Sequence, residues 1–175
     1  MTKLTCSKVC LILCISLVAG FVPPAWANFT TGFAAYQRHD YARAMREFKA
    51  DGGPQSSYLL AIMYYKGEGI APDKKEAAKW LRVSAEKGNV KAANNLGMMY
   101  DKGDGIPRDL PMAAKWYRKA AEKGDAQSQF NLGLMYTNGE GVQKDPKEAV
   151  KWLRKAARQK HVNARKLLNV MGEKP

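Results

Sequence analysis

Residues 92–127 read AANNLGMMYDKGDGIPRDLPMAAKWYRKAAEKGDAQ, and the same pattern stands 36 residues before and 36 residues after this stretch. At least five columns keep one residue type in all three copies without a gap. They are Tyr64, Tyr100 and Tyr136; Trp80, Trp116 and Trp152; Gly67, Gly103 and Gly139; Gly69, Gly105 and Gly141; and Asp73, Asp109 and Asp145. A period of this length is typical of a solenoid, in which each unit buries its apolar face only against its neighbours. Function is then expected on an extended surface.

Within one copy the apolar residues predict two helices joined by a glycine loop. In the middle copy one helical face starts at Ala92 and a second starts at Ala113. Gly103 is expected to end the first helix, because glycine accepts a positive φ without a Cβ clash. Asp109 is expected to cap the second helix, as are Asp73 and Asp145, which Glu76 and Glu148 follow at the spacing of a capping box. The pattern predicts an all-α fold, a right-handed α/α solenoid of helix-turn-helix repeats.

The first 27 residues have the pattern of a secretory signal peptide. Lys3 and Lys8 give a positive start, residues 9–18 are almost wholly apolar, and Ala25-Trp26-Ala27 fits a signal peptidase site. The apolar run is short against the roughly 20 residues that a spanning helix needs. We therefore expect cleavage after Ala27, a periplasmic or secreted protein, and no transmembrane segment after processing.

Composition excludes thiol chemistry in the exported protein. All three cysteines, Cys6, Cys10 and Cys14, lie in the removable segment, so disulfides, cysteine metal sites and thiol nucleophiles are not expected. The formal net charge of +13 falls by only two when Lys3 and Lys8 are removed. The remaining chain is strongly cationic.

The string Asn131-Leu-Gly-Leu-Met-Tyr136, followed by Asn-Gly-Glu-Gly-Val at 138–142, Asp145, Lys151-Trp152 and Ala156-Ala157, resembles the Sel1-like repeat, a relative of the tetratricopeptide repeat. The resemblance implies TPR-like helix pairs and this division: N-terminal capping helices at 28–55, repeats at 56–91, 92–127 and 128–160, and a C-terminal capping helix with its tail at 161–175. Residues 40–50 are expected to form a lone second helix with Phe48 in the core. Lys160 replaces the closing glycine before a final helix that contains Val162, Ala164, Leu168 and Met171.

The sequence offers little for catalysis. His39 and His161 stand near opposite ends of the solenoid, so they cannot share a site. Ser84-Ala-Glu-Lys87 matches the Ser-x-x-Lys of penicillin-recognising enzymes, but Ser84 occupies an alanine column, where alanine should replace it without loss of stability. Cysteine-rich relatives in the family have been linked to β-lactam binding, yet their cysteines are missing here. We expect no enzyme, and keep β-lactam hydrolysis as a weak alternative.

Metal and cofactor sites are not expected. Glu68, Asp104 and Glu140 recur between loop glycines, but successive repeats hold equivalent residues on the order of 10 Å apart. One cation needs several oxygens within about 2.6 Å. These carboxylates are expected to be solvated.

Basic residues form two neighbouring columns on the second helices, which we call the basic ridge. They are Lys79, Lys115 and Lys151, with Arg82, Arg118 and Arg154 three residues further on. The ridge is either a solvated outer surface or a surface for an anionic partner such as an envelope polymer. Nucleic acid is not expected, because no aromatic-interleaved platform accompanies the charges.

The resemblance implies that the first helices line the concave side of the solenoid. Their non-core residues are Tyr58, Leu59, Ile62 and Lys66, then Asn94, Asn95, Met98 and Lys102, then Phe130, Asn131, Leu134 and Asn138. This mixture suits an extended peptide or a partner helix, with Tyr58 and Phe130 as anchors and Asn95 and Asn131 bonding to backbone. The asparagines alternatively serve packing. The leading expectation is a non-enzymatic protein–protein interaction module, an adaptor of the bacterial envelope or secreted fraction.

Overall fold

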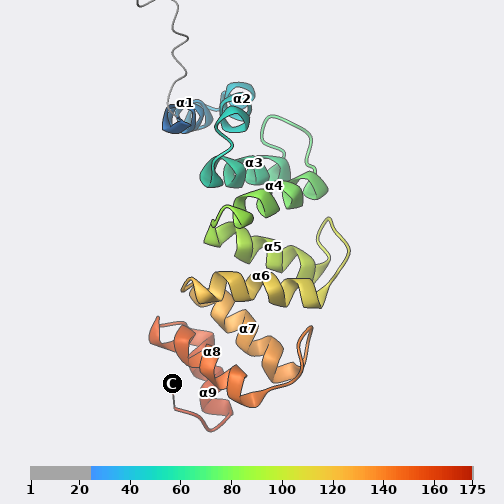
Figure 1. Ribbon diagram of the computed structural model, residues 1–175, viewed down its shortest axis with the longest axis vertical. Helices are drawn as coiled ribbons and strands as arrows, with labels where there is room; N and C mark the ends of the chain where they lie inside the picture. Colours follow the sequence, from blue (N-terminus) through green and yellow to red (C-terminus); the bar gives the residue numbers. More distant parts are fainter. Residues whose placement is uncertain (1–24, 175) are drawn as a thin grey trace, which may run out of the picture.

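A computed structural model describes residues 25–174, and this range folds into nine helices that pack in sequential pairs. They are α1 (Ala25–Gln37), α2 (Tyr41–Asp51), α3 (Pro54–Lys66), α4 (Lys74–Glu86), α5 (Val90–Lys102), α6 (Leu110–Glu122), α7 (Ala126–Asn138), α8 (Pro146–Arg158) and α9 (Val162–Val170). The helices stack along the long axis, and the three glycine loops project from one side (Figure 1). The predicted all-α solenoid is confirmed. Of the predicted signal peptide, residues 1–24 lie outside the described range, and α1 begins inside the expected processing site.

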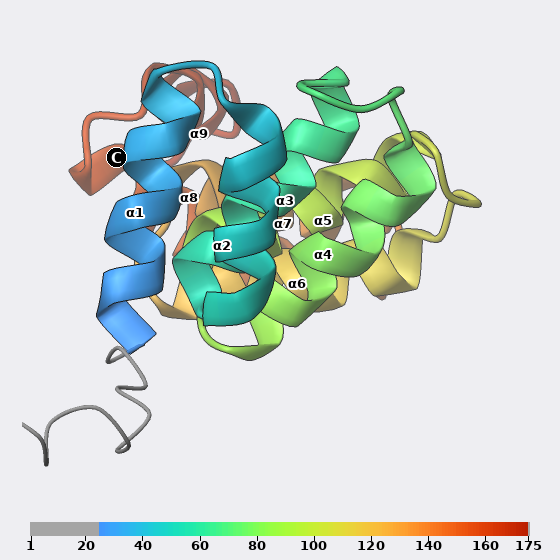
Figure 2. The same ribbon diagram turned by 90° about the horizontal axis from the view of Figure 1, so that it is seen from above.

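Odd-numbered helices are the first helices of their units, and even-numbered helices up to α8 are the second helices. Seen from above, α3, α5 and α7 overlap one another, while α4 and α6 lie to one side (Figure 2). Alanines at the same position in each second helix, Ala77, Ala113 and Ala149, are fully buried. The small side chains allow close helix approach, which leaves room for the aromatic columns.

The aromatic columns lie in the core or pack against it. Trp116 and Trp152 are buried, and Tyr64 is 9% exposed. Trp80, Tyr100 and Tyr136 are half-buried and pack against the apolar clusters. The clusters run from one unit to the next, since Tyr100 contacts both central ones. This continuity is the expected basis of stability in a repeat protein.

The aspartate column caps the second helices, but the capping boxes are incomplete. Asp73 accepts a hydrogen bond from the backbone N–H of Glu76 at 2.8 Å. The reciprocal bond is missing, because the backbone N–H of Asp73 donates to the carbonyl of Tyr64 at 2.8 Å. Glu76 instead pairs with Lys79 at 2.6 Å. The prediction of a full capping box was therefore wrong, and the aspartate ties the second helix to the first.

The second glycine of each loop is required by a close approach between units. Gly105 has a φ of +77°, and a Cβ built there would lie 2.2 Å from Cβ of Lys74. Gly69 meets Tyr41 in the same way. Each loop therefore rests on the beginning of the second helix in the preceding unit, and a larger residue would push the units apart.

The loop carboxylates are also engaged between units, so the expectation that they are solvated was wrong for two of them. Glu68 accepts a hydrogen bond from the hydroxyl of Tyr36 at 2.7 Å, and Asp104 accepts one from Tyr65 at 2.7 Å. Burial, together with the hydrogen bond to Glu68, raises the pKa of Tyr36 to about 12. Glu140 is exposed. Tyr36 and Tyr65 are each the last residue but one of a first helix. In the unit before Glu140 this position, in α5, holds Asp101.

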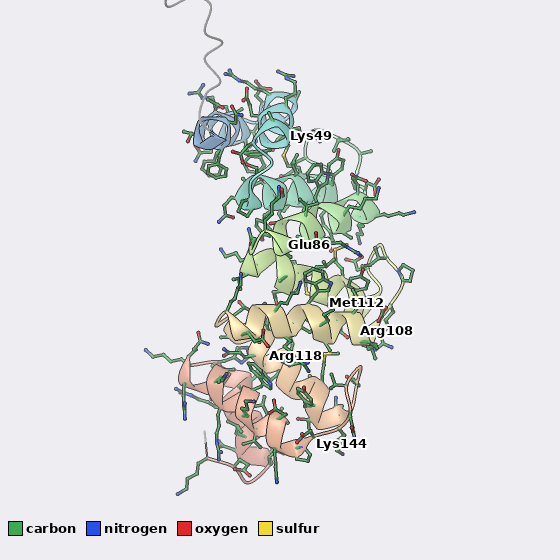
Figure 3. The ribbon with its side chains drawn as sticks, viewed as in Figure 1. Lys49, Glu86, Arg108, Met112, Arg118 and Lys144 are labelled. Carbon is green, nitrogen blue, oxygen red and sulfur yellow. The ribbon has the colours of Figure 1, made fainter. Side chains whose placement is uncertain are left out.

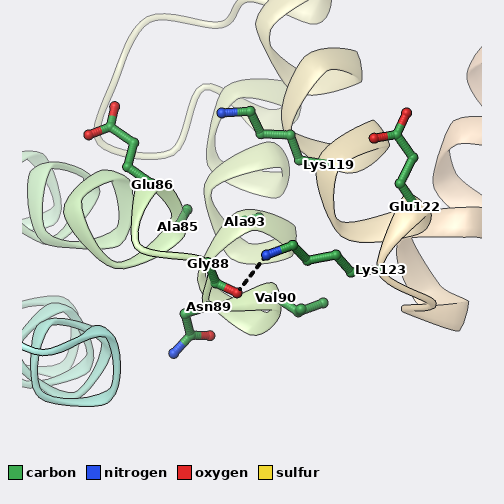
Figure 4. Close-up of a pocket in the computed structure, with 9 residues that line it drawn as sticks. All are labelled: Ala85, Glu86, Gly88, Asn89, Val90, Ala93, Lys119, Glu122 and Lys123. Atoms are coloured by element: carbon green, nitrogen blue, oxygen red, sulfur yellow. Dashed lines mark hydrogen bonds between the residues drawn. The ribbon is translucent and has the colours of Figure 1, made fainter.

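A ladder on the opposite side links the closing turns. Lys87 donates to the carbonyl of Gly52, Lys123 donates to Gly88 at 3.2 Å, and Gln159 donates to Gly124 at 2.9 Å. Figure 4 shows Lys123, which follows the last residue of α6, reaching to the carbonyl of Gly88. These side chains satisfy carbonyls at helix ends that have no partner within their own helix.

The N-terminal end of the solenoid differs from expectation, and the C-terminal end largely follows it. The helix at 40–50 is not lone, because α1 precedes it and packs along α2. Gly32 of α1 lies directly against the buried ring of Phe48, where a Cβ would be 2.8 Å from the ring. At the C-terminus, Lys160 has a φ of +66° and so adopts the conformation of the glycines it replaces. Val162 is 62% exposed and is not part of the α9 core.

Candidate functional site: a groove between the first helices of two repeats

A groove of about 230 Å³ opens between α3 and α5. Its lining comprises Ala61, Ile62, Tyr65, Lys66, Leu81, Asn95, Met98, Met99, Lys102 and Asp104. Ala61, Leu81 and Met99 are almost fully buried and form its apolar base. Tyr65 and Met98 are 40% and 38% exposed, so both present apolar surface to the solvent beside this base. The groove thus combines an apolar base, exposed apolar walls and a polar rim.

A three-residue network holds one end of the groove. Asp104 accepts hydrogen bonds from Tyr65 and from Lys74, each at 2.7 Å. The Lys74 ammonium also lies 5.3 Å from the centre of the Tyr65 ring. The bond from Lys74 lowers the pKa of Asp104, the bond to Asp104 raises the pKa of Lys74, and the same carboxylate raises the pKa of Tyr65. The network fixes the ring of Tyr65 as a wall.

Several predicted recognition residues meet at this groove. Ile62, Asn95 and Met98 line it, together with Lys66 and Lys102. The groove therefore forms on the first helices, where the resemblance implied a recognition surface. Sequence reasoning missed Tyr65 and Asp104. The signal for Tyr65 was its position next to the core residue Tyr64, where the following residue of a helix points away from the core.

Asn95 and most of the other predicted recognition residues make contacts within the chain. Asn95 donates to the hydroxyl of Tyr58 at 3.4 Å, and Tyr58 packs on a core cluster. Asn94 accepts a hydrogen bond from Ser128 at 2.9 Å. The ring of Phe130 stacks on His161 with centroids 4.7 Å apart. Leu59 packs against the N-terminal cluster, and Asn131 accepts a hydrogen bond from Gln127 at 2.9 Å. Leu134 is half-buried and Asn138 is exposed.

The equivalent space in the next repeat is filled. Tyr117 stands where the first groove has Leu81, and it is 1% exposed. Gly97 stands where the first groove has Ala61, and a Cβ at Gly97 would lie 2.7 Å from the Tyr117 ring. The ring therefore occupies the volume that the shorter leucine leaves open. Burial raises the pKa of the Tyr117 hydroxyl, which lies beside Asp101 and Asn131.

The basic ridge is largely occupied by internal contacts. Arg82 donates to the hydroxyl of Tyr100, Arg118 donates to Tyr136 at 2.5 Å, and Arg154 pairs with Glu173 at 2.7 Å. Lys79 pairs with Glu76 at 2.6 Å and Lys151 pairs with Glu148 at 2.7 Å. Each ridge arginine thus joins its helix to a segment further along the chain.

Lys115 differs from the other two ridge lysines. The glutamate that precedes Lys79 and Lys151 by three residues is replaced by Met112 in the middle repeat. Figure 3 places Met112 near the beginning of α6. The exposed ammonium of Lys115 therefore lacks the neighbouring carboxylate that the other repeats supply, and positive charge on the ridge is concentrated in its middle.

A further hollow of about 290 Å³ lies on the closing-turn side, beside the bond between Lys123 and Gly88 (Figure 4). Its rim carries both charge signs, from Glu86 and Glu122 and from Lys119 and Lys123. Lys123 already belongs to the ladder between units. This hollow is therefore a less suitable binding site than the groove between α3 and α5.

The Ser-x-x-Lys motif forms no nucleophilic site. Ser84 is fully buried, and its hydroxyl donates to the carbonyl of Pro54 at 2.6 Å. Lys87 belongs to the ladder of closing turns and donates to Gly52. A nucleophile needs access to substrate and a base within hydrogen-bond reach. Ser84 has a structural role between repeats.

His39 and His161 also contact neighbouring side chains. His39 lies 2.8 Å from the hydroxyl of Tyr41, and His161 caps α9 through the backbone N–H of Ala164 at 3.3 Å. Within residues 25–174, no group of three or more His, Cys, Asp or Glu side chains could hold a metal ion. In the same range, no helix has the length and apolar character to cross a membrane.

Comparison with known proteins identifies the repeats. The sequence profile of the Sel1 repeat matches residues 54–89, 90–125 and 126–161, which is more than half of the chain. The chain belongs to the Sel1 repeat family. The matched units begin two residues before those expected from the sequence, at the start of each first helix. Sel1 repeat proteins are typically protein-interaction modules, and most are not enzymes.

Three solved bacterial structures resemble this Sel1 repeat chain. A Sel1 repeat protein from Oxalobacter formigenes is 38% identical, with a TM-score of 0.69 over 74% of this chain and 55% of its own. A protective antigen of uropathogenic Escherichia coli strains, which displays an SLR fold, is 34% identical, with a TM-score of 0.77 over 85% of this chain and 33% of its own. Cysteine rich protein B of Helicobacter pylori is 25% identical, with a TM-score of 0.54 over 78% of this chain and 94% of its own. No curated protein matches the chain.

Proposed function

We propose that this protein is a non-enzymatic adaptor that binds a segment of a partner protein on its first helices, with the groove between α3 and α5 as the main contact. The groove is the observation that carries the proposal. It exposes Tyr65 and Met98 beside a buried apolar base and places amide and ammonium groups around them. Apolar anchors within a polar rim are the usual composition of a protein-binding surface.

The environment of the protein is part of the proposal. The positive start, apolar run and small-residue site in residues 1–27 support export to the periplasm or to the outside of a bacterial cell. The partner is then an envelope or secreted protein. N-terminal sequencing of the protein purified from its native envelope should begin at Asn28, and a retained segment before Asn28 would contradict cleavage after Ala27.

A second candidate is binding of an anionic envelope polymer on the basic ridge. One observation favours it, namely the exposed Lys115 without a glutamate three residues before it. Against it, the ridge arginines and the other two ridge lysines already have partners within the chain. We therefore rank the ridge below the groove.

Site-specific photo-crosslinking can separate the two surfaces. Benzoylphenylalanine would replace Met98 in the groove, Lys115 on the ridge, or Val162, which is 62% exposed and belongs to neither surface. We expect a crosslinked partner protein from position 98 alone in the native host. A protein adduct from all three positions would indicate non-specific contact. Adducts from position 115 alone, or none from position 98, would refute the groove as the contact.

A further inference from the structure

We infer that the groove takes one large apolar side chain from a partner segment with a carboxylate next to it, and that Lys102 recognises this carboxylate. The inference rests on the proposed function and names the chemistry of the segment that the groove accepts. It follows from three observations: the size of the groove, the charge on its rim, and the closure of the equivalent space in the next repeat.

The size and base of the groove favour a single side chain. Its volume of about 230 Å³ lies below the roughly 300–1,000 Å³ typical of sites for small molecules. The base of Ala61, Leu81 and Met99 is apolar and nearly inaccessible to water. An unbranched or aromatic side chain placed there would cover Tyr65 and Met98, so that both sides lose apolar surface to water.

The charge on the rim favours a carboxylate. Lys102 is exposed, and within residues 25–174 no hydrogen bond or ion pair holds its ammonium group. Asp104 is already bonded to Tyr65 and Lys74. Lys66, on the opposite helix, lies 3.4 Å from Glu68. Lys102 is therefore the positive group of the rim that remains available to a negatively charged partner.

The next repeat offers neither the space nor the lysine that we invoke, because Asn138 stands at the position of Lys102. Tyr117 fills the volume at the position of Leu81, and Asp101 stands at the position of Tyr65. Asp101 lies beside the buried Tyr117 hydroxyl. An acidic segment would meet a closed surface and a like charge there. We therefore expect the site between α3 and α5 and none between α5 and α7.

Fluorescence anisotropy with short peptides tests the inference. The probe is fluorescein-labelled Glu-Glu-Met-Glu-Glu, and the controls are Lys-Lys-Met-Lys-Lys and Glu-Glu-Gly-Glu-Glu. The full chain should bind the probe with a stoichiometry of one and at least about tenfold more tightly than either control. Lys102→Glu should abolish this preference and favour the basic peptide, while the matched ridge variant Lys115→Glu should leave it unchanged.

A second variant tests whether the apolar base of the groove is needed for binding. Ala61→Gly with Leu81→Tyr copies the pair that packs in the next repeat, so it should fill the groove without unfolding the chain. Circular dichroism checks the fold, and probe binding should be lost although Lys102 remains. Equal binding of probe and controls, no binding of any peptide, or probe binding that survives the filled groove would overturn the inference. Crosslinking from position 98 would still stand in those cases, so failure here is distinct from failure of the proposed function.

Discussion

Replacing Glu148 by methionine should lower the free energy of unfolding by about 2 kcal/mol, because it removes the only hydrogen-bond partner that residues 25–174 give to a buried indole. Glu148 accepts from Nε1 of Trp152 at 3.0 Å and from Lys151 at 2.7 Å. Trp152 is 6% exposed. Methionine at this position is compatible with the repeat, since Met112 occupies it in the middle unit.

Most of this loss in the free energy of unfolding comes from the indole N–H of Trp152, which is left without an acceptor. An unsatisfied buried donor costs about 1–3 kcal/mol. The pair with Lys151 adds only about 0.3–0.5 kcal/mol, because both side chains are partly exposed. The loss of an acid in the first turn of α8 adds about 0.3–1 kcal/mol, and the partly buried methionine recovers roughly 1 kcal/mol. The sum is about 2 kcal/mol.

Urea unfolding followed by circular dichroism measures this difference, with the slope of the transition unchanged. Glu148→Gln is the matched control, because its amide oxygen can still accept from Trp152 while the ion pair is lost. It should lower stability by less than about 1 kcal/mol. If Glu148→Met and Glu148→Gln are equally destabilising, charge and not the indole bond explains the effect, and the reasoning is refuted.

The remaining predictions concern buried serines, pH and the repeat unit. Ser84→Ala should lower the free energy of unfolding by about 0.5–1 kcal/mol, because it removes the hydrogen bond to the Pro54 carbonyl. Ser57→Ala should raise it by about 1 kcal/mol, because the equally buried Ser57 hydroxyl has no partner within residues 25–174. Urea unfolding measures both changes. The pKa of Asp104 is lowered, so its contribution is present above the ordinary aspartate pKa of about 3.9 and is lost as pH falls below it. The stability difference between the native protein and Asp104→Asn should therefore be constant near neutral pH and vanish in acid. Deleting residues 92–127 should leave a helical chain of lower stability, whereas deleting 18 residues from the same region should unfold it, as circular dichroism would show.

The periodic part of the fold could be predicted from the sequence because each column repeats a local requirement. Gly103 takes a positive φ and Asp109 caps a helix wherever their column recurs, so three copies give the same signal three times. Capping helices were expected at 28–55, but the pairing of α1 with α2 was missed, because the residues of α1 follow a signal-like segment and have no fixed spacing to the repeats. Only contact in space, such as Gly32 against Phe48, shows that α1 and α2 form a further pair.

The candidate site could be predicted only in part, because it depends on contacts between units. Ile62, Asn95 and Met98 were expected from their position on the first helices, and they line the groove. The role of Asp104 was not accessible, since its partners Tyr65 and Lys74 stand 39 and 30 residues away. Ser84 shows the same limit: its column contains alanine, yet its hydroxyl bonds to a carbonyl in the preceding first helix. This hydrogen bond is why we now expect Ser84→Ala to lower stability and not to be neutral.

The three repeats differ from one another at a few positions, and these differences decide where the groove and the ridge lysine that lacks a neighbouring acid lie. The middle unit has Met112 where its neighbours have glutamate, Tyr117 where they have leucine, and Asp101 where the first has Tyr65. Met112 leaves Lys115 without its neighbouring acid, and Tyr117 closes, in the middle unit, the space whose equivalent Leu81 leaves open between α3 and α5. Because packing between units needs only the shared columns, these positions are free to differ from unit to unit. They give a nearly symmetric scaffold a groove between α3 and α5 and a ridge lysine without a neighbouring acid at defined places along its length.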